Sequence, residues 1–180
     1  MKGSNVALTG LLLAFTVACG TQPASRPADS YTGAGSDVEH FASFEAAVRS
    51  ADAVAFVSVI GSAPGRTVTV STVTLPFTNV TMKVLEAAKG VATGAVIVVE
   101  QTGGATPNGA LVSDTDPPYR TGTTHLLLLR SIPAGFRIIS SVGRYDVVGG
   151  AIRRNEHADF PNPFVGKTAT ELITWARQLR

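Results

Sequence analysis

Few side chains in this sequence are suited to catalysis or to metal binding. It contains one cysteine, Cys19, and three histidines, at positions 40, 125 and 157. A zinc or calcium site needs several ligands at set spacings, and no paired cysteines, His-x-x-x-His pattern or calcium loop is present. His125 begins an apolar run, which is typical of a packed histidine, and His157 lies in a polar turn. We therefore predict no catalytic residue, no metal and no cofactor.

The most suggestive polar group is the pair Asp114 and Asp116, followed by Tyr119 and Arg120. We expect residues 102–122 to form one long loop, and loops beyond about 12–15 residues are often functional. Tyrosine and arginine are enriched among residues that dominate binding energy. The sequence thus predicts a binding loop in which Tyr119 and Arg120 contribute most. Two alternatives are a merely mobile connection and ordinary Asp-Pro turn chemistry.

Cys19 follows an apolar run at the start of the chain. Residues 6–18 form a 13-residue apolar stretch, preceded by Lys2. That length is too short for a membrane-spanning helix, which needs roughly 20 residues, but it suits the apolar part of an export signal. A lone cysteine in an exported protein would be an unpaired thiol in an oxidising place. Its position therefore calls for a chemical role.

The residues before Cys19 supply such a role. Thr16-Val17-Ala18-Cys19 resembles the bacterial lipoprotein signal, although an aliphatic residue is usual where Thr16 stands. The resemblance implies a diacylglyceryl thioether on Cys19, cleavage before it, and acylation of the new amine. The expected location is the extracytoplasmic face of the cell membrane, with the lipid as the anchor. Ordinary signal cleavage with a secreted product stays open.

Composition divides the chain into three parts. We expect a signal peptide at 1–18, a lipidated flexible tether at 19–38 and a folded domain at 39–180. The tether is rich in Gly, Ser, Thr, Pro and Ala, and so has little surface to bury. The formal net charge of +2 is too small to indicate a nucleic-acid partner.

The sequence of the domain predicts a mainly β fold with a helix near each end. Ser43 is a plausible cap for a helix to residue 50, and Thr168 with Glu171 forms a capping box for a C-terminal helix. Leu172, Trp175, Ala176 and Leu179 share a face of that second helix. Val80, Met82 and Val84 alternate with polar residues and predict an inward stripe. Further strands are expected at residues 53–60, 95–101, 125–129, 136–140, 145–148 and 151–153.

Three phrases within residues 44–154 carry a family resemblance. SADAVAFVSVIG, FTNVTMKVLEAAKG and YRTGTTHLLLLR are similar to the netrin and tissue-metalloproteinase-inhibitor-like OB-fold proteins, in particular bacterial secreted relatives of unassigned function. The resemblance implies a five-stranded, partly open barrel with a helix packed against it. We therefore expect a mainly β domain: a small antiparallel OB-like barrel of five to seven strands, with a short N-terminal helix and a C-terminal helix. Protease inhibition does not carry over, because the animal inhibitors use disulfides and a free N-terminal cysteine.

Together these features predict a membrane-anchored, non-enzymatic lipoprotein. We expect a binding or envelope-associated module of unknown ligand, with a possible extracytoplasmic protein partner. The alternatives are a plain secreted protein and an accessory subunit of an extracytoplasmic enzyme.

Overall fold

A computed structural model describes residues 29–31, 39–70, 73–107, 109–158 and 160–179. The predicted signal peptide, Cys19 and most of the predicted tether lie outside these residues. In chain order the elements are β1 (Asp29–Tyr31), α1 (Phe44–Ser50), β2 (Ala53–Val70), β3 (Val73–Lys89), β4 (Val96–Thr102), β5 (Gly104–Thr106), β6 (Gly109–Ser113), β7 (Thr124–Ile132), β8 (Gly135–Ile138), a 3-10 turn (Ser141–Gly143), β9 (Arg144–Val148), β10 (Ala151–Ile152) and α2 (Ala169–Gln178).

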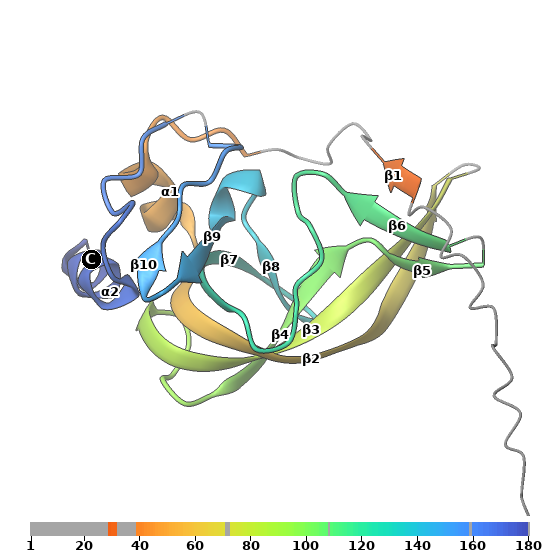
Figure 1. Ribbon diagram of the computed structural model, residues 1–180, viewed down its shortest axis with the longest axis horizontal. Coiled ribbons are helices and arrows are strands. Elements are labelled where there is room, and N and C mark those ends of the chain that lie inside the picture. Colours follow the sequence, from red (N-terminus) through yellow and green to blue (C-terminus); the bar gives the residue numbers. More distant parts are fainter. Residues whose placement is uncertain (1–28, 32–38, 71–72, 108, 159, 180) are drawn as a thin grey trace, which may run out of the picture.

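Five of the strands close into a ring (Figure 1). β2 pairs with β3 on one side and β7 on the other, β3 pairs with β4, and β8 pairs with both β7 and β4. β9 and β10 continue the sheet outward from β7, giving seven strands in all. The protein is thus mainly β, as predicted.

The expectation of a purely antiparallel sheet is wrong. β4 and β8 run parallel, and Val99 pairs with Phe136. The reason is geometric: strands that alternate in direction cannot close a ring of odd number, so one neighbouring pair in a five-membered ring must be parallel. The sheet is therefore mixed.

Two hydrophobic clusters lie on opposite faces of β7. Leu127 and Leu129 pack with Val80, Met82 and Val84 among the ring strands, and the predicted inward stripe on β3 is fully buried. The alternate residues of β7 face the helices and contribute to the second cluster. Burial on both faces explains why the sequence of β7 contains a continuous run of apolar residues.

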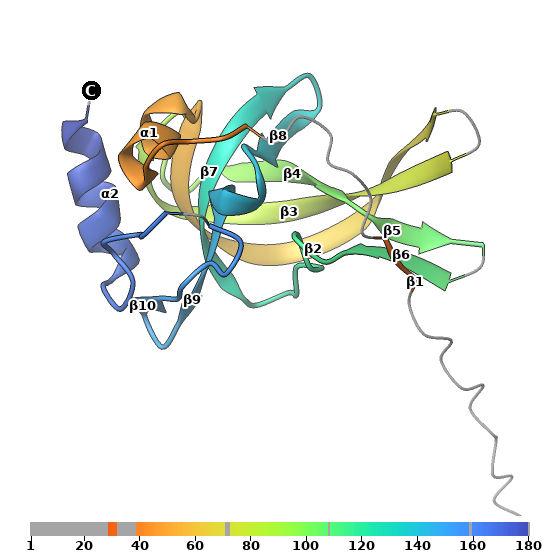
Figure 2. The same ribbon diagram turned by 90° about the horizontal axis from the view of Figure 1, so that it is seen from above.

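Both predicted helices are confirmed, with their caps. The Ser43 hydroxyl accepts a hydrogen bond from the backbone N–H of Ala46, and Thr168 and Glu171 form the full capping box. α1 and α2 gather at one end of the molecule, while the β2–β3 hairpin reaches out at the other end beside β5 and β6 (Figure 2). The Phe44 ring of α1 stacks on Trp175 of α2, with 5.8 Å between centroids.

One segment of the predicted tether is structured differently from the expectation. Asp29–Tyr31 forms β1, which pairs in parallel with β6. The edge of a short hairpin presents unpaired backbone groups that accept such a strand. Within the described ranges, the helices are too short or too polar to cross a membrane.

Candidate functional site

The predicted binding loop is partly a β-hairpin. Residues 104–106 and 109–113 form β5 and β6, which pair with each other, so the expectation of one long loop over residues 102–122 is wrong. Gly103 and Gly109 adopt positive φ angles of 106° and 140°, which let the backbone turn into and within the hairpin. The irregular part begins after Ser113 and leads to β7 (Figure 1).

The structure separates the four residues predicted to bind. Asp114 and Arg120 are exposed, whereas Asp116 and Tyr119 are buried. Tyr119 belongs to the cluster among the ring strands, so it acts as a core residue supplied by the loop. A side chain that packs inward cannot present its surface to a partner. Of the four residues, only Asp114 and Arg120 are exposed to a partner.

A buried glutamine ties this loop to β4. The Gln101 amide donates to the carbonyl oxygens of Asp116 and Pro117, at 3.0 and 2.8 Å. Its own oxygen accepts from the backbone N–H of Tyr119 at 3.4 Å. These bonds pair both ends of the buried Gln101 amide with backbone groups of the loop. The loop is therefore a fixed part of the domain.

Arg144 of β9 holds the loop from the other side. Its guanidinium pairs with the Asp116 carboxylate at 3.1 Å and also donates to the Pro117 carbonyl. Burial raises the pKa of Asp116, and the neighbouring Arg144 opposes that rise. A charged pair removed from water to this extent is costly to break on one side only. No spacing signal indicates this pair in the sequence, because Arg144 lies 28 residues after Asp116.

A hydroxyl, an imidazole and a carboxylate form a chain beside this pair. The Thr123 hydroxyl lies 2.7 Å from Nε2 of His125, and Nδ1 of His125 lies 2.9 Å from the Asp146 carboxylate. Such an order of groups is found in enzymes that activate a nucleophile. Here the Thr123 hydroxyl also donates to the Arg120 carbonyl at 2.7 Å. All three bonds are satisfied together when the imidazole carries both ring protons. The Thr123 hydroxyl then donates its proton to the Arg120 carbonyl and accepts from the imidazole.

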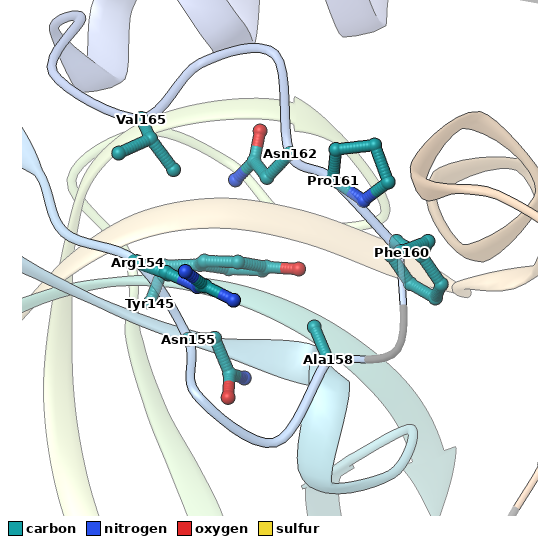
Figure 3. Close-up of a pocket in the computed structure, with 8 residues that line it drawn as sticks. All are labelled: Tyr145, Arg154, Asn155, Ala158, Phe160, Pro161, Asn162 and Val165. Carbon is teal, nitrogen blue, oxygen red and sulfur yellow. The ribbon is translucent and has the colours of Figure 1, made fainter.

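A separate pocket of about 450 Å³ lies near β9 and the segment before α2 (Figure 3). This volume falls within the range of small-molecule pockets. The Tyr145 and Arg154 side chains overlap in the middle of the close-up, with Asn162 and Pro161 above them and Asn155 below (Figure 3). The lining residues are Tyr145, Arg154, Asn155, Ala158, Phe160, Pro161, Asn162 and Val165.

Two buried polar atoms in this pocket have no hydrogen-bond partner. They are the hydroxyl of Tyr145 and the amide nitrogen of Asn162. Buried polar groups are nearly always paired, so each exception requires an explanation. Burial raises the pKa of Tyr145, which keeps the hydroxyl protonated and able to donate. Both groups can donate a hydrogen bond, and the Tyr145 hydroxyl can also accept one.

The surrounding structure fixes both side chains. The Tyr145 ring meets the Phe44 ring edge-to-face with 5.6 Å between centroids. The Asn162 oxygen accepts from the backbone N–H of Phe164 at 2.8 Å. Asn155 donates to the carbonyls of Ser141 and Arg144, at 2.7 and 2.9 Å, and so holds the chain that carries Arg154. The pocket is thus preformed rather than assembled by loose side chains.

Sequence reasoning did not predict this pocket. Tyr145 and Arg154 stand out as an aromatic among arginines, yet that pattern is equally typical of a solvated hairpin. On β9, Arg144 and Asp146 face the loop while Tyr145 faces the helices, because side chains alternate along a strand. The pocket depends on the path of residues 160–165, for which the sequence offers only the Pro161-Asn162-Pro163 turn signal. Across the described ranges, no group of three His, Cys, Asp or Glu residues is placed to hold a metal ion.

Comparison with known proteins adds no relative. No family model, curated protein or solved structure matches this chain.

Proposed function

We propose that this protein is a lipid-anchored, extracytoplasmic binding module without enzymatic activity. The observation that supports the binding role is the pocket lined by Tyr145 and Asn162. The Tyr145 hydroxyl and the Asn162 amide nitrogen are buried there without a hydrogen-bond partner. A site that leaves buried donors unpaired in the free protein favours a ligand that pairs them. The anchor rests on the sequence, where Cys19 follows an export-like apolar stretch.

We further propose that the ring is an OB-like barrel. Five strands, antiparallel except for one neighbouring pair, and a helix at one end are consistent with that architecture. The three phrases that resemble the netrin-like group lie largely on β2, β3 and β7. The rigid ring would then be the frame, with the pocket held by the segment between β10 and α2.

An enzyme, or an accessory subunit of one, is the second candidate. The chain of Thr123, His125 and Asp146 is the observation in its favour. Two features argue against it. The Thr123 hydroxyl is engaged by the Arg120 carbonyl, and His125 is only 3% exposed. An imidazole so covered has little access to a substrate. The arrangement instead suits a structural link between the loop and β9.

The anchor is tested by the mass of the membrane form. The protein purified from membranes should begin at Cys19 and carry acyl chains. Cys19→Ala should release the protein from membranes or leave it uncleaved. A mature chain that begins elsewhere and carries no lipid would contradict the anchor and support a secreted protein. The binding role is tested separately, with the probes described below.

A further inference from the structure

We infer that the pocket at Tyr145 binds a small organic carboxylate with an apolar body. This inference rests on the proposed binding role and specifies its ligand. The pocket offers three polar groups to a ligand. The Tyr145 hydroxyl and the Asn162 amide nitrogen are unpaired donors, and Arg154 adds a guanidinium.

The side-chain amide oxygens of the pocket each accept one hydrogen bond already. The Asn162 oxygen accepts from the backbone of Phe164, and the Asn155 oxygen accepts from the backbone of His157. None of the described lining residues carries a carboxylate side chain. A carboxylate brings acceptors only, so it can pair the Tyr145 hydroxyl, the Asn162 amide nitrogen and the Arg154 guanidinium without adding a donor of its own. The donors of the pocket therefore favour a carboxylate.

The charge of the site agrees with this choice. Arg154 is exposed beside the pocket, and its guanidinium matches a carboxylate in both charge and shape. An ammonium ligand would face this cation, and none of the described lining residues offers a carboxylate to compensate for it. A cation is therefore the least suitable ligand for these groups.

The remaining lining side chains are apolar. They are Ala158, Phe160, Pro161 and Val165. An apolar wall opposite a few converging polar groups is the usual design of a small-ligand site. A ligand with a carboxylate at one end and a short hydrocarbon or aromatic body at the other fits both parts.

The test compares three water-soluble probes that share one body. Phenylacetate, 2-phenylethanol and phenethylamine are titrated into the full mature protein in mild detergent, with binding followed by NMR chemical shifts. We expect saturable binding of phenylacetate, with shifts at the Ala158 and Val165 methyl groups. The amine should bind at least about tenfold more weakly, which is the cost of losing one hydrogen bond to a charged group.

Three substitutions separate the pocket groups from general effects. Tyr145→Phe removes only the unpaired hydroxyl, so it should weaken phenylacetate binding about tenfold without lowering the melting temperature. Asn162→Asp keeps the oxygen that accepts from Phe164 but replaces the donor with a negative charge, and should also weaken binding. Arg154→Gln should weaken binding, whereas Arg153→Gln, an exposed neighbour outside the lining, should not.

The outcomes distinguish two failures. If the alcohol or the amine binds in the pocket as well as phenylacetate does, the carboxylate inference is wrong while a binding role stands. If none of the three probes binds, both the inference and this pocket's proposed role fail. Unchanged phenylacetate affinity in Tyr145→Phe would also overturn the inference. The lipid anchor is unaffected by any of these results.

Discussion

The guanidinium carbon of Arg144 lies 3.8 Å from the centre of the Tyr119 ring. The same guanidinium pairs with Asp116, so one side chain of β9 contacts both buried residues of the loop. A cation over an aromatic face is stabilised by the ring's negative charge distribution, more so when water is excluded. This contact joins β9 to the loop residue that packs into the core of the five-stranded ring.

Arg144→Gln should strongly destabilise the domain. The substitution leaves the Asp116 carboxylate buried without its cation, and breaking one side of a buried pair costs about 3–5 kcal/mol. Arg120→Gln makes the same charge change at an exposed position and should stay within about 0.5 kcal/mol of the original protein. Urea unfolding at pH 7 measures both. Equal stability of the two variants would show that the pair contributes little.

Asp146 should make stability fall in acid. The hydrogen bond from His125 holds the pKa of Asp146 below its usual value of 3.8. A carboxyl with a lowered folded pKa stabilises the fold above its unfolded pKa, and that stability is lost as pH falls through the folded pKa. Because Asp146 is half exposed, its contribution should be at most about 1 kcal/mol.

Comparing unfolding free energies at pH 5 and pH 2.5 tests this dependence. Asp146→Asn should lose less stability over that interval than the original protein does. Asp114→Asn, a change at an exposed carboxyl in the loop, serves as the control and should leave the acid dependence unaltered. An equally steep loss in Asp146→Asn would assign the acid sensitivity to other carboxyls.

Gly90 should tolerate no side chain. Its φ is +78°, and a Cβ there would overlap the Asp52 carbonyl oxygen and the backbone of Ala53. Gly94 has a similar φ of +84° but open space where its Cβ would lie. Gly94→Ala should therefore cost about 1 kcal/mol for the backbone alone. Gly90→Ala should cost clearly more, by several degrees in melting temperature. Equal losses would mean that the strand end adjusts freely.

Replacing the loop should lower stability even if no ligand is involved. A short Gly-Ser linker in place of residues 105–118 removes Asp116 and the Pro117 carbonyl, which are partners of Gln101 and Arg144. The Gln101 amide nitrogen would then lose both of its acceptors and Arg144 its closest carboxylate, while both side chains stay largely buried. The melting temperature should fall by several degrees, as measured by circular dichroism. Unchanged melting would instead indicate that the loop is a dispensable connection.

The sequence predicted the elements whose stability is local. Ser43 and Thr168 mark helix starts through bonds to residues three positions away, and the alternation around Met82 follows from the pleat of one strand. The parallel contact of Val99 with Phe136 has no local signal, because it follows from closing the ring.

The candidate site was harder to predict for the same reason. Asp116 and Tyr119 resemble exposed loop residues until Arg144 and Gln101 are placed beside them. Likewise, the pocket at Tyr145 is recognisable only once residues 160–165 are placed beside β9. The sequence shows that the loop contains Tyr119 and Arg120. Only the packing determines that Tyr119 is buried and Arg120 is exposed.

The ring also implies an order of folding. β2 and β3 are joined directly, with Val70 paired to Val73, so their hairpin needs only local contacts. β2 must also meet β7, where Ala53 pairs with Leu129, and this contact encloses most of the domain. Closing a long loop costs more chain entropy than closing a short one, and distant pairings slow folding. We therefore predict that amide protection in pulsed hydrogen exchange appears first at the β2–β3 hairpin and later at the amides that pair β2 with β7; simultaneous protection of both would refute this order.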